Sequence, residues 1–143
     1  MAYRTRRRGF VPSAIAVGLF LAVANHGSAH SSASAAAMSA AGGGGTLSCS
    51  GLEALWESAG GSPGAAPMAA SIAMAESGGQ QYATDNNTNG TTDRGYFQIN
   101  STWGALSTYD PIGNAKAAVA ISHDGQDWSP WVTYQTGAYQ GQC

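Results

Sequence analysis

An apolar, alanine-rich segment that ends in a single acid is the strongest constraint on the fold of this chain. Met68, Ile72 and Glu76 are spaced four residues apart, so on a helix they lie on one face. Gly78-Gly79 ends the segment, because glycine readily takes the left-handed conformation that follows a last helical turn. Glu76 therefore ends an apolar stripe, where partial removal from water disfavours the charged form and raises the pKa. A general acid needs such a raised pKa at neutral pH.

A second acid follows the predicted helix after a polar, turn-forming stretch. Asp93 lies 17 residues beyond Glu76, and Asn89-Gly90 lies between them. Asn-Gly is a strong hairpin signal, since a type I′ turn needs positive φ at both central residues. The aromatic and β-branched residues of 96–99 favour extended structure, so the sequence predicts a small β-hairpin beside the helix. One shielded and one solvated carboxyl group is an arrangement that cleaves glycosidic bonds.

The stretch from Glu76 to Trp103 resembles the active-site segment of chicken-type lysozymes, without a gap. The residues in common are Glu76-Ser77, Ala83-Thr84, Asn87-Thr88, Gly90, Thr92-Asp93, Gly95, Gln98-Ile99-Asn100-Ser101 and Trp103. In that family the glutamate is the general acid, and the aspartate is the nucleophile or stabilises the developing charge. The resemblance implies these roles for Glu76 and Asp93.

The chain also resembles the soluble lytic transglycosylase family. Glu76-Ser77 matches its catalytic ES pair, and residues 95–99 match its GLMQI-type run. Residues 134–137 approximate its YNxG-type run, with Gln135 in place of the usual asparagine. Both resemblances imply an α+β, mainly helical, lysozyme-like domain with a short hairpin beside the helix of Glu76. They imply substrate contacts from Ser77, Gln98, Asn100, Trp103 and Tyr134. For Trp103, a place in the core is the alternative interpretation.

The chain divides into a leader, a linker and one domain. Residues 1–29 are predicted to be a signal peptide, with a basic start at Arg4 and Arg6–Arg8 followed by an apolar run. That run is shorter than the roughly 20 residues of a membrane-spanning helix, which favours cleavage and export over an uncleaved anchor. Residues 30–46, rich in Ser, Ala and Gly, are predicted to be a flexible tether. Residues 47–143 form the predicted lysozyme-like domain.

Three further helices are predicted in this domain. The first covers Leu52–Ser58, and the second follows the cap Asp110-Pro111 as far as Ser122. A third is expected after Ser129-Pro130, where Trp131, Tyr134 and Ala138 have the helical spacing typical of a core stripe. Asn114, within the second of these helices, is interpreted as a structural hydrogen-bonding residue.

The two cysteines, Cys49 and Cys143, bracket the predicted domain. In an exported protein, a disulfide is the default for such a pair. Free thiols and a metal pair are the less favoured alternatives, because two cysteines without nearby histidines do not make a zinc site. The sequence contains no phosphate-binding loop or metal-ligand pattern, so neither a metal nor a cofactor is expected.

The charge of the mature chain limits its partners. Four of the six basic residues lie in the leader, so the rest keeps Arg94 and Lys116 against eight acids, a formal charge of −6. Such a domain is not expected to bind nucleic acid, or an anionic membrane once the leader is removed, through bulk charge. Recognition would instead depend on a cleft with aromatic side chains and short hydrogen bonds.

The sequence thus predicts a secreted, extracellular or cell-wall enzyme that acts as a monomer on peptidoglycan. The predicted reaction is cleavage of the β-1,4 bond between N-acetylmuramic acid and N-acetylglucosamine, with Glu76 as the general acid. Two second steps are open. Asp93 can support hydrolysis by water, or the substrate's own N-acetyl group and 6-hydroxyl can form an anhydro-sugar. A non-catalytic cell-wall glycan-binding module and a chitin-directed enzyme are the alternatives.

Overall fold

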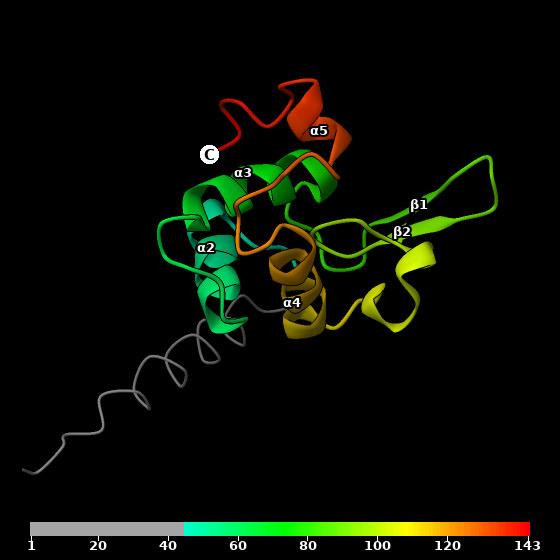
Figure 1. Ribbon diagram of the computed structural model, residues 1–143, viewed down its shortest axis with the longest axis horizontal. Helices are drawn as coiled ribbons and strands as arrows, with labels where there is room; N and C mark the ends of the chain where they lie inside the picture. Colours follow the sequence, from blue (N-terminus) through cyan, green and yellow to red (C-terminus); the bar gives the residue numbers. More distant parts are fainter. Residues whose placement is uncertain (1–44) are drawn as a thin grey trace, which may run out of the picture.

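The computed structural model describes residues 45–143 (Figure 1). The predicted signal peptide of residues 1–29 and the tether as far as residue 44 lie outside the described residues. In chain order the elements are α2 (Cys49–Ser58), α3 (Ala66–Ser77), β1 (Thr84–Asn86), β2 (Thr92–Arg94), β3 (Ile99–Asn100), the 3-10 helix η1 (Ser101–Leu106), α4 (Pro111–Ile121) and α5 (Val132–Gln135). This is a small, mostly helical α+β domain with a three-stranded antiparallel sheet, which confirms the predicted fold class.

Helices α2, α3 and α4 surround the core (Figure 1). The buried residues of α3 and α4 are mostly alanines, whose small side chains let the helices approach closely. Trp56 of α2 is fully buried, with its ring 6.2 Å from that of Phe97 and 5.5 Å from that of Trp128. The core is therefore built from small residues around a few large aromatic side chains.

The ends of the helices follow from their capping residues. The side chain of Asp110 accepts a hydrogen bond from Gly113 N at 2.6 Å at the start of α4, with Pro111 in the first position, as predicted. Gly78 ends α3 in the left-handed conformation with φ of 61°. The Asp110 cap thus fixes where α4 begins, and the Gly78 cap fixes where α3 ends. The helix α3 begins at Ala66, so Pro67 lies in its first turn, where no intrahelical acceptor is needed.

The sheet has the order β1-β2-β3, and β1 and β2 form the predicted hairpin. The predicted type I′ turn at Asn89-Gly90 is wrong. Residues 87–91 form a longer loop in which Gly90 has a φ of 83° while Asn89 has no positive φ. The Asn89 side chain instead accepts hydrogen bonds from Thr91 N and Thr91 Oγ1. Local side-chain bonding of this kind competes with the two-residue turn.

The predicted extended run at residues 96–99 is confirmed only at Ile99, because residues 95–98 form a turn. Gln98 N donates to Gly95 O at 3.1 Å, and Phe97 N donates to the buried Asn114 Oδ1 at 2.9 Å. Asn114 Nδ2 also donates to Arg94 O and Thr108 O. Asn114 thus has the predicted structural role, and it replaces a strand partner for this part of the backbone.

The predicted helix start at Ser129-Pro130 is wrong, since α5 begins at Val132 with Trp131 before it and without a side-chain cap. Trp131 is buried and its Nε1 donates to Phe97 O at 2.9 Å. This bond ties Trp131 to the core, and the helix begins only at the next residue. Of the predicted core stripe only Trp131 is buried, while Tyr134 and Ala138 are exposed.

The ends of the described chain are tied to the fold. A disulfide joins Cys49 to Cys143, as predicted, and it is consistent with an extracellular location. Gly45 O accepts hydrogen bonds from Tyr96 Oη at 2.6 Å and Gln81 N at 2.8 Å. Gly45 is therefore part of the fold, although the sequence assigned it to the tether. Among residues 45–143, no helix has the length and apolar character needed to cross a membrane.

Candidate active site

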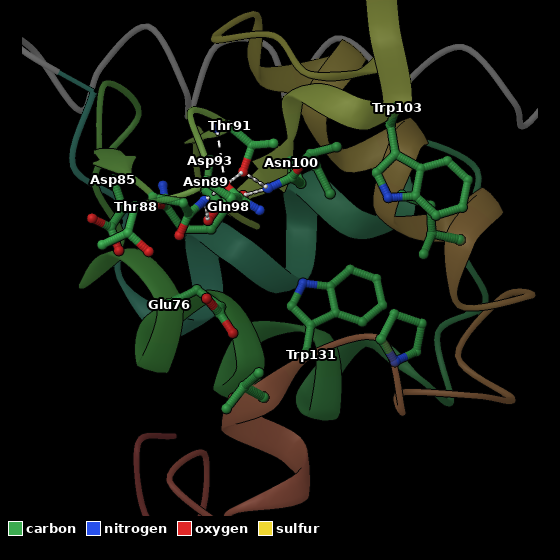
Figure 2. Close-up of a pocket in the computed structure, with 15 residues that line it drawn as sticks. Glu76, Asp85, Thr88, Asn89, Thr91, Asp93, Gln98, Asn100, Trp103 and Trp131 are labelled. Carbon is green, nitrogen blue, oxygen red and sulfur yellow. Dashed lines mark hydrogen bonds between the residues drawn. The ribbon is translucent and has the colours of Figure 1, made fainter.

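A cleft of about 560 Å³ opens between the end of α3, the sheet, η1 and the start of α5 (Figure 2). Its lining residues are Glu76, Asp85, Asn87, Thr88, Asn89, Thr91, Asp93, Gln98, Ile99, Asn100, Trp103, Ile121, Pro130, Trp131 and Val132. Figure 2 shows Glu76 on one side facing the sheet residues Asp93 and Asn100, with the rings of Trp103 and Trp131 farther along. The cleft thus has a carboxyl-rich end and an aromatic end.

Glu76 lies in the last turn of α3 and is half-buried. Burial raises the pKa of Glu76 above its ordinary value of 4.5, and the nearby negative charge of Asp93 raises it further. Hydrogen bonds from Thr133 oppose this change, including one from Thr133 Oγ1 to Glu76 Oε1 at 2.5 Å. Burial is the largest of these effects. Glu76 therefore retains its proton at higher pH than an exposed glutamate.

Asp93 lies in the middle of β2 and is held by two amides. Asn87 Nδ2 donates to Asp93 Oδ2 at 2.8 Å, and Asn100 Nδ2 donates to Asp93 Oδ1 at 2.7 Å. The same two amide nitrogens donate to Thr91 Oγ1 at 3.0 Å (Figure 2). Both carboxyl oxygens are thus oriented by neutral donors, which fix the carboxylate without neutralising its charge.

A third acid, Asp85, also lines the cleft, and the sequence prediction missed it. Asp85 pairs directly with Asp93 across the antiparallel strands β1 and β2, so both side chains lie on one face of the hairpin. The hairpin register would have revealed this pair, had the length of the turn been known. The residues lining the cleft include three carboxyl groups and no lysine, arginine or histidine.

Five of the predicted site residues meet at this cleft: Glu76, Asp93, Gln98, Asn100 and Trp103. The Trp103 side chain is 50% exposed, so this residue is not part of the core. Gln98 Nε2 donates to Ala83 O at 3.0 Å and to Gly95 O at 2.8 Å, which ties it to the turn before β3.

Two of the predicted substrate contacts do not line the cleft. Ser77 is buried, and its hydroxyl donates to Ala73 O at 2.9 Å within α3. The Tyr134 ring stacks on Tyr139, with centroids 5.4 Å apart. Thr133, one residue before Tyr134, contacts Glu76 instead. The contact with Glu76 thus comes from the residue that directly precedes the YNxG-like run.

No group of three or more His, Cys, Asp or Glu side chains in the part of the chain that the structure describes is arranged to hold a metal ion. The chemistry that this arrangement of groups supports is acid catalysis by Glu76 beside a fixed carboxylate.

Comparison with known proteins agrees with this geometry. A family model described as a lysozyme-like domain matches residues 53–133, more than half of the chain. The matched stretch holds α3, the sheet and α4, and both Glu76 and Asp93 lie within it. Among curated proteins, none matches the chain at a significant level. The chain belongs to the lysozyme-like domain family.

Proposed function

We propose that this chain is a peptidoglycan glycosidase that cleaves the β-1,4 bond between N-acetylmuramic acid and N-acetylglucosamine. Glu76 is the general acid, which transfers its proton to the glycosidic oxygen as the bond to the sugar breaks. One observation carries the proposal: the half-buried Glu76, with a raised pKa, shares a cleft with an amide-held Asp93. A glycan-binding module would have no use for a shielded acid.

The orientation of Asp93 favours a hydrolytic reaction rather than one that forms an anhydro-sugar. The anhydro route uses the substrate's own N-acetyl group and 6-hydroxyl and needs no second carboxylate. Here both oxygens of Asp93 are oriented in the cleft by Asn87 and Asn100. The carboxylate is thus available to stabilise the developing positive charge or to attack the sugar carbon. Water then adds to that carbon and returns a proton to Glu76.

The rest of the cleft is suited to a sugar chain. The exposed Trp103 offers an aromatic face for stacking, and the hairpin offers amide and hydroxyl groups for hydrogen bonds. A glycan strand of amino sugars carries both kinds of complementary surface. The predicted signal peptide and the disulfide support action outside the cell, where peptidoglycan lies.

The test is the product that the purified protein releases from insoluble peptidoglycan, identified by mass spectrometry. We expect sugars with a free reducing end, whereas an anhydro product would be lighter by one water and would overturn the hydrolytic route. Glu76→Gln should abolish release and retain binding. The matched control is Glu57→Gln, which changes an exposed acid on α2 and should leave release unchanged.

The same experiment separates the alternatives. If the wild-type protein releases no more than Glu76→Gln while both bind, the chain is a binding module. Chitin oligosaccharides tested in parallel identify a chitin-directed enzyme, since chitin contains the N-acetylglucosamine unit without the muramic acid.

A further inference from the structure

Glu76 receives a hydrogen bond from an element other than its own helix. Thr133 Oγ1 on α5 donates to Glu76 Oε1 at 2.5 Å. Among the described residues, no other side chain is within hydrogen-bond distance of this carboxyl group. Figure 1 shows α5 beside the end of α3, where Glu76 lies.

We propose that Thr133 is a positioning residue, which directs the acidic proton of Glu76 to Oε2 and stabilises the carboxylate left after proton transfer. This inference rests on the proposed function of the cleft. Because the hydroxyl hydrogen of Thr133 faces Oε1, a second proton on that oxygen would meet it at close range. The proton therefore resides on Oε2, which protonates a substrate held in the cleft.

The hydrogen bond changes in strength during the reaction. A hydroxyl bound to a carboxylate makes a bond about twice as strong as one to a neutral acceptor. The contact with Thr133 thus tightens as Glu76 gives up its proton. An interaction that is stronger in the transition state than in the ground state increases kcat.

The electrostatics of Glu76 agree with this role. Burial raises the pKa of Glu76, while the hydroxyl and the backbone N–H of Thr133 lower it. The other charged groups that line the cleft are Asp85 and Asp93, both on the hairpin, and α5 contributes no charged side chain. Thr133 is therefore the group from α5 that opposes the effect of burial on the pKa of Glu76.

The hydroxyl is held in place by anchors on both sides of α5. Before the helix, the buried Trp131 is bonded to Phe97 O. After it, the Cys143 disulfide ties the segment to the start of α2. Thr133 is half-buried, whereas its neighbours Val132 and Tyr134 are exposed. The fold thus turns this one side chain of α5 towards Glu76.

The test compares Thr133→Val, which keeps the shape and removes the hydroxyl, with Thr133→Ser, which keeps the hydroxyl. Thr136→Val is the matched control, because the Thr136 hydroxyl donates to Val132 O within the same segment. For each protein, kcat and KM are measured on soluble glycan fragments as a function of pH. The titration of the Glu76 carboxyl carbon is followed by NMR in the same proteins.

For Thr133→Val we expect kcat to fall about tenfold with KM unchanged, the effect of losing a hydrogen bond to a charged group. The alkaline limb of the pH profile and the NMR titration of Glu76 should both move to higher pH. Thr133→Ser should restore all three quantities, and Thr136→Val should match the wild type.

Two results would overturn the inference. One is a Glu76 titration in Thr133→Val that is the same as in the wild type. The other is a Thr133→Ser protein as impaired as Thr133→Val, which would indicate a packing role. If the wild-type protein releases no product, the proposed function fails, and the NMR titration still decides whether Thr133 stabilises the carboxylate. Should Thr133→Val not fold, Thr133→Ala provides the same titration.

Discussion

Two of the carboxyl groups in the cleft, those of Glu76 and Asp93, belong to regions that set the environment of a carboxyl group by different physical means. Glu76 ends a helix whose inner face is buried, and its environment is set mainly by removal from water. Asp93 lies in a small polar sheet in which all three residues of the first strand, β1, are exposed. The environment of Asp93 is set by two amide donors. Burial favours the protonated form of an acid, whereas hydrogen-bond donors orient an ionised one.

The stability of the fold and the geometry of the cleft come from different regions of the molecule. Helix α3 contributes Ala69, Ala70, Ile72 and Ala73 to the core, all with no exposed surface. Strand β1 contributes no buried residue, and the hairpin is joined to the core through the Asn114 network. Stability should therefore be sensitive to changes on the helical side and at Asn114, and activity to changes around Asp93.

The largest expected effect concerns the helical side, through the disulfide that ties Cys143 to the start of α2. In the double variant Cys49→Ser/Cys143→Ser, we expect the free energy of unfolding to fall by about 4 kcal/mol, because the open chain gains entropy on unfolding. Urea unfolding measures it, and reduction of the wild-type protein should cause the same loss. Equal unfolding midpoints for the oxidised wild type and the variant would show that the link adds nothing.

The next effect tests the connection between the two regions. Asn114→Ala removes three hydrogen bonds and leaves Phe97 N, Arg94 O and Thr108 O without their partner. At about 1 kcal/mol for each bond, we expect a loss of about 3 kcal/mol in urea unfolding. Asn86→Ala on the exposed strand β1 is the control, and it should change stability by less than about 0.5 kcal/mol. A similar loss in both variants would contradict the special role of Asn114.

The helical side could be predicted from the sequence much better than the sheet. Glycine at the end of α3 and Asp110-Pro111 at the start of α4 act through local geometry, so the residues themselves reveal the helix ends. The turn at Asn89-Gly90 could not be predicted, because Thr91 competes for the side chain of Asn89. Tertiary partners also keep the residues around Tyr96 out of a strand.

The residues of the candidate site also differ in how well the sequence predicts them. Glu76 and Asp93 could be predicted because one continuous motif, from Glu76 to Trp103, contains both. Thr133 could not, since it lies 57 residues from Glu76 and the contact depends on how α5 packs against α3. Asp85 required the strand register, which in turn depended on the mispredicted turn. Sequence motifs thus indicate the candidate carboxyl groups, and packing decides what surrounds them.

Asp93→Asn should have a smaller effect on stability and a clear one on activity. The substituted amide nitrogen would face a donor, either Asn87 or Asn100, so we expect a loss of about 1–2 kcal/mol in unfolding. In the proposed mechanism this change removes the negative charge beside the sugar carbon, so it should lower kcat by about 100-fold. Steady-state kinetics on glycan fragments measures this change, with Asn86→Ala again as the control. An unchanged kcat would show that the substrate itself replaces the carboxylate.

Glu76→Gln should have the smallest effect on stability, and of the opposite sign at neutral pH. Because burial raises the pKa of Glu76 in the folded protein above 4.5, the native state binds its proton more tightly than the unfolded state does. The contribution of Glu76 to stability is therefore fully present below pH 4.5 and is lost as pH rises through the folded pKa.

A neutral glutamine has no such dependence, so Glu76→Gln should be more stable than the wild type at pH 7, and this advantage should shrink as pH falls through the folded pKa towards 4.5 and be lost below that pH. Urea unfolding of both proteins across this pH range measures the difference, with Glu57→Gln as the control for loss of an exposed acid. A stability difference that does not change with pH would mean that Glu76 is not shielded. The contrast with Asp93→Asn, which destabilises, would then disappear. A gain at pH 7 from the same substitution that abolishes release would show that the fold holds Glu76 at the expense of stability, as expected for a proton donor kept partly out of water.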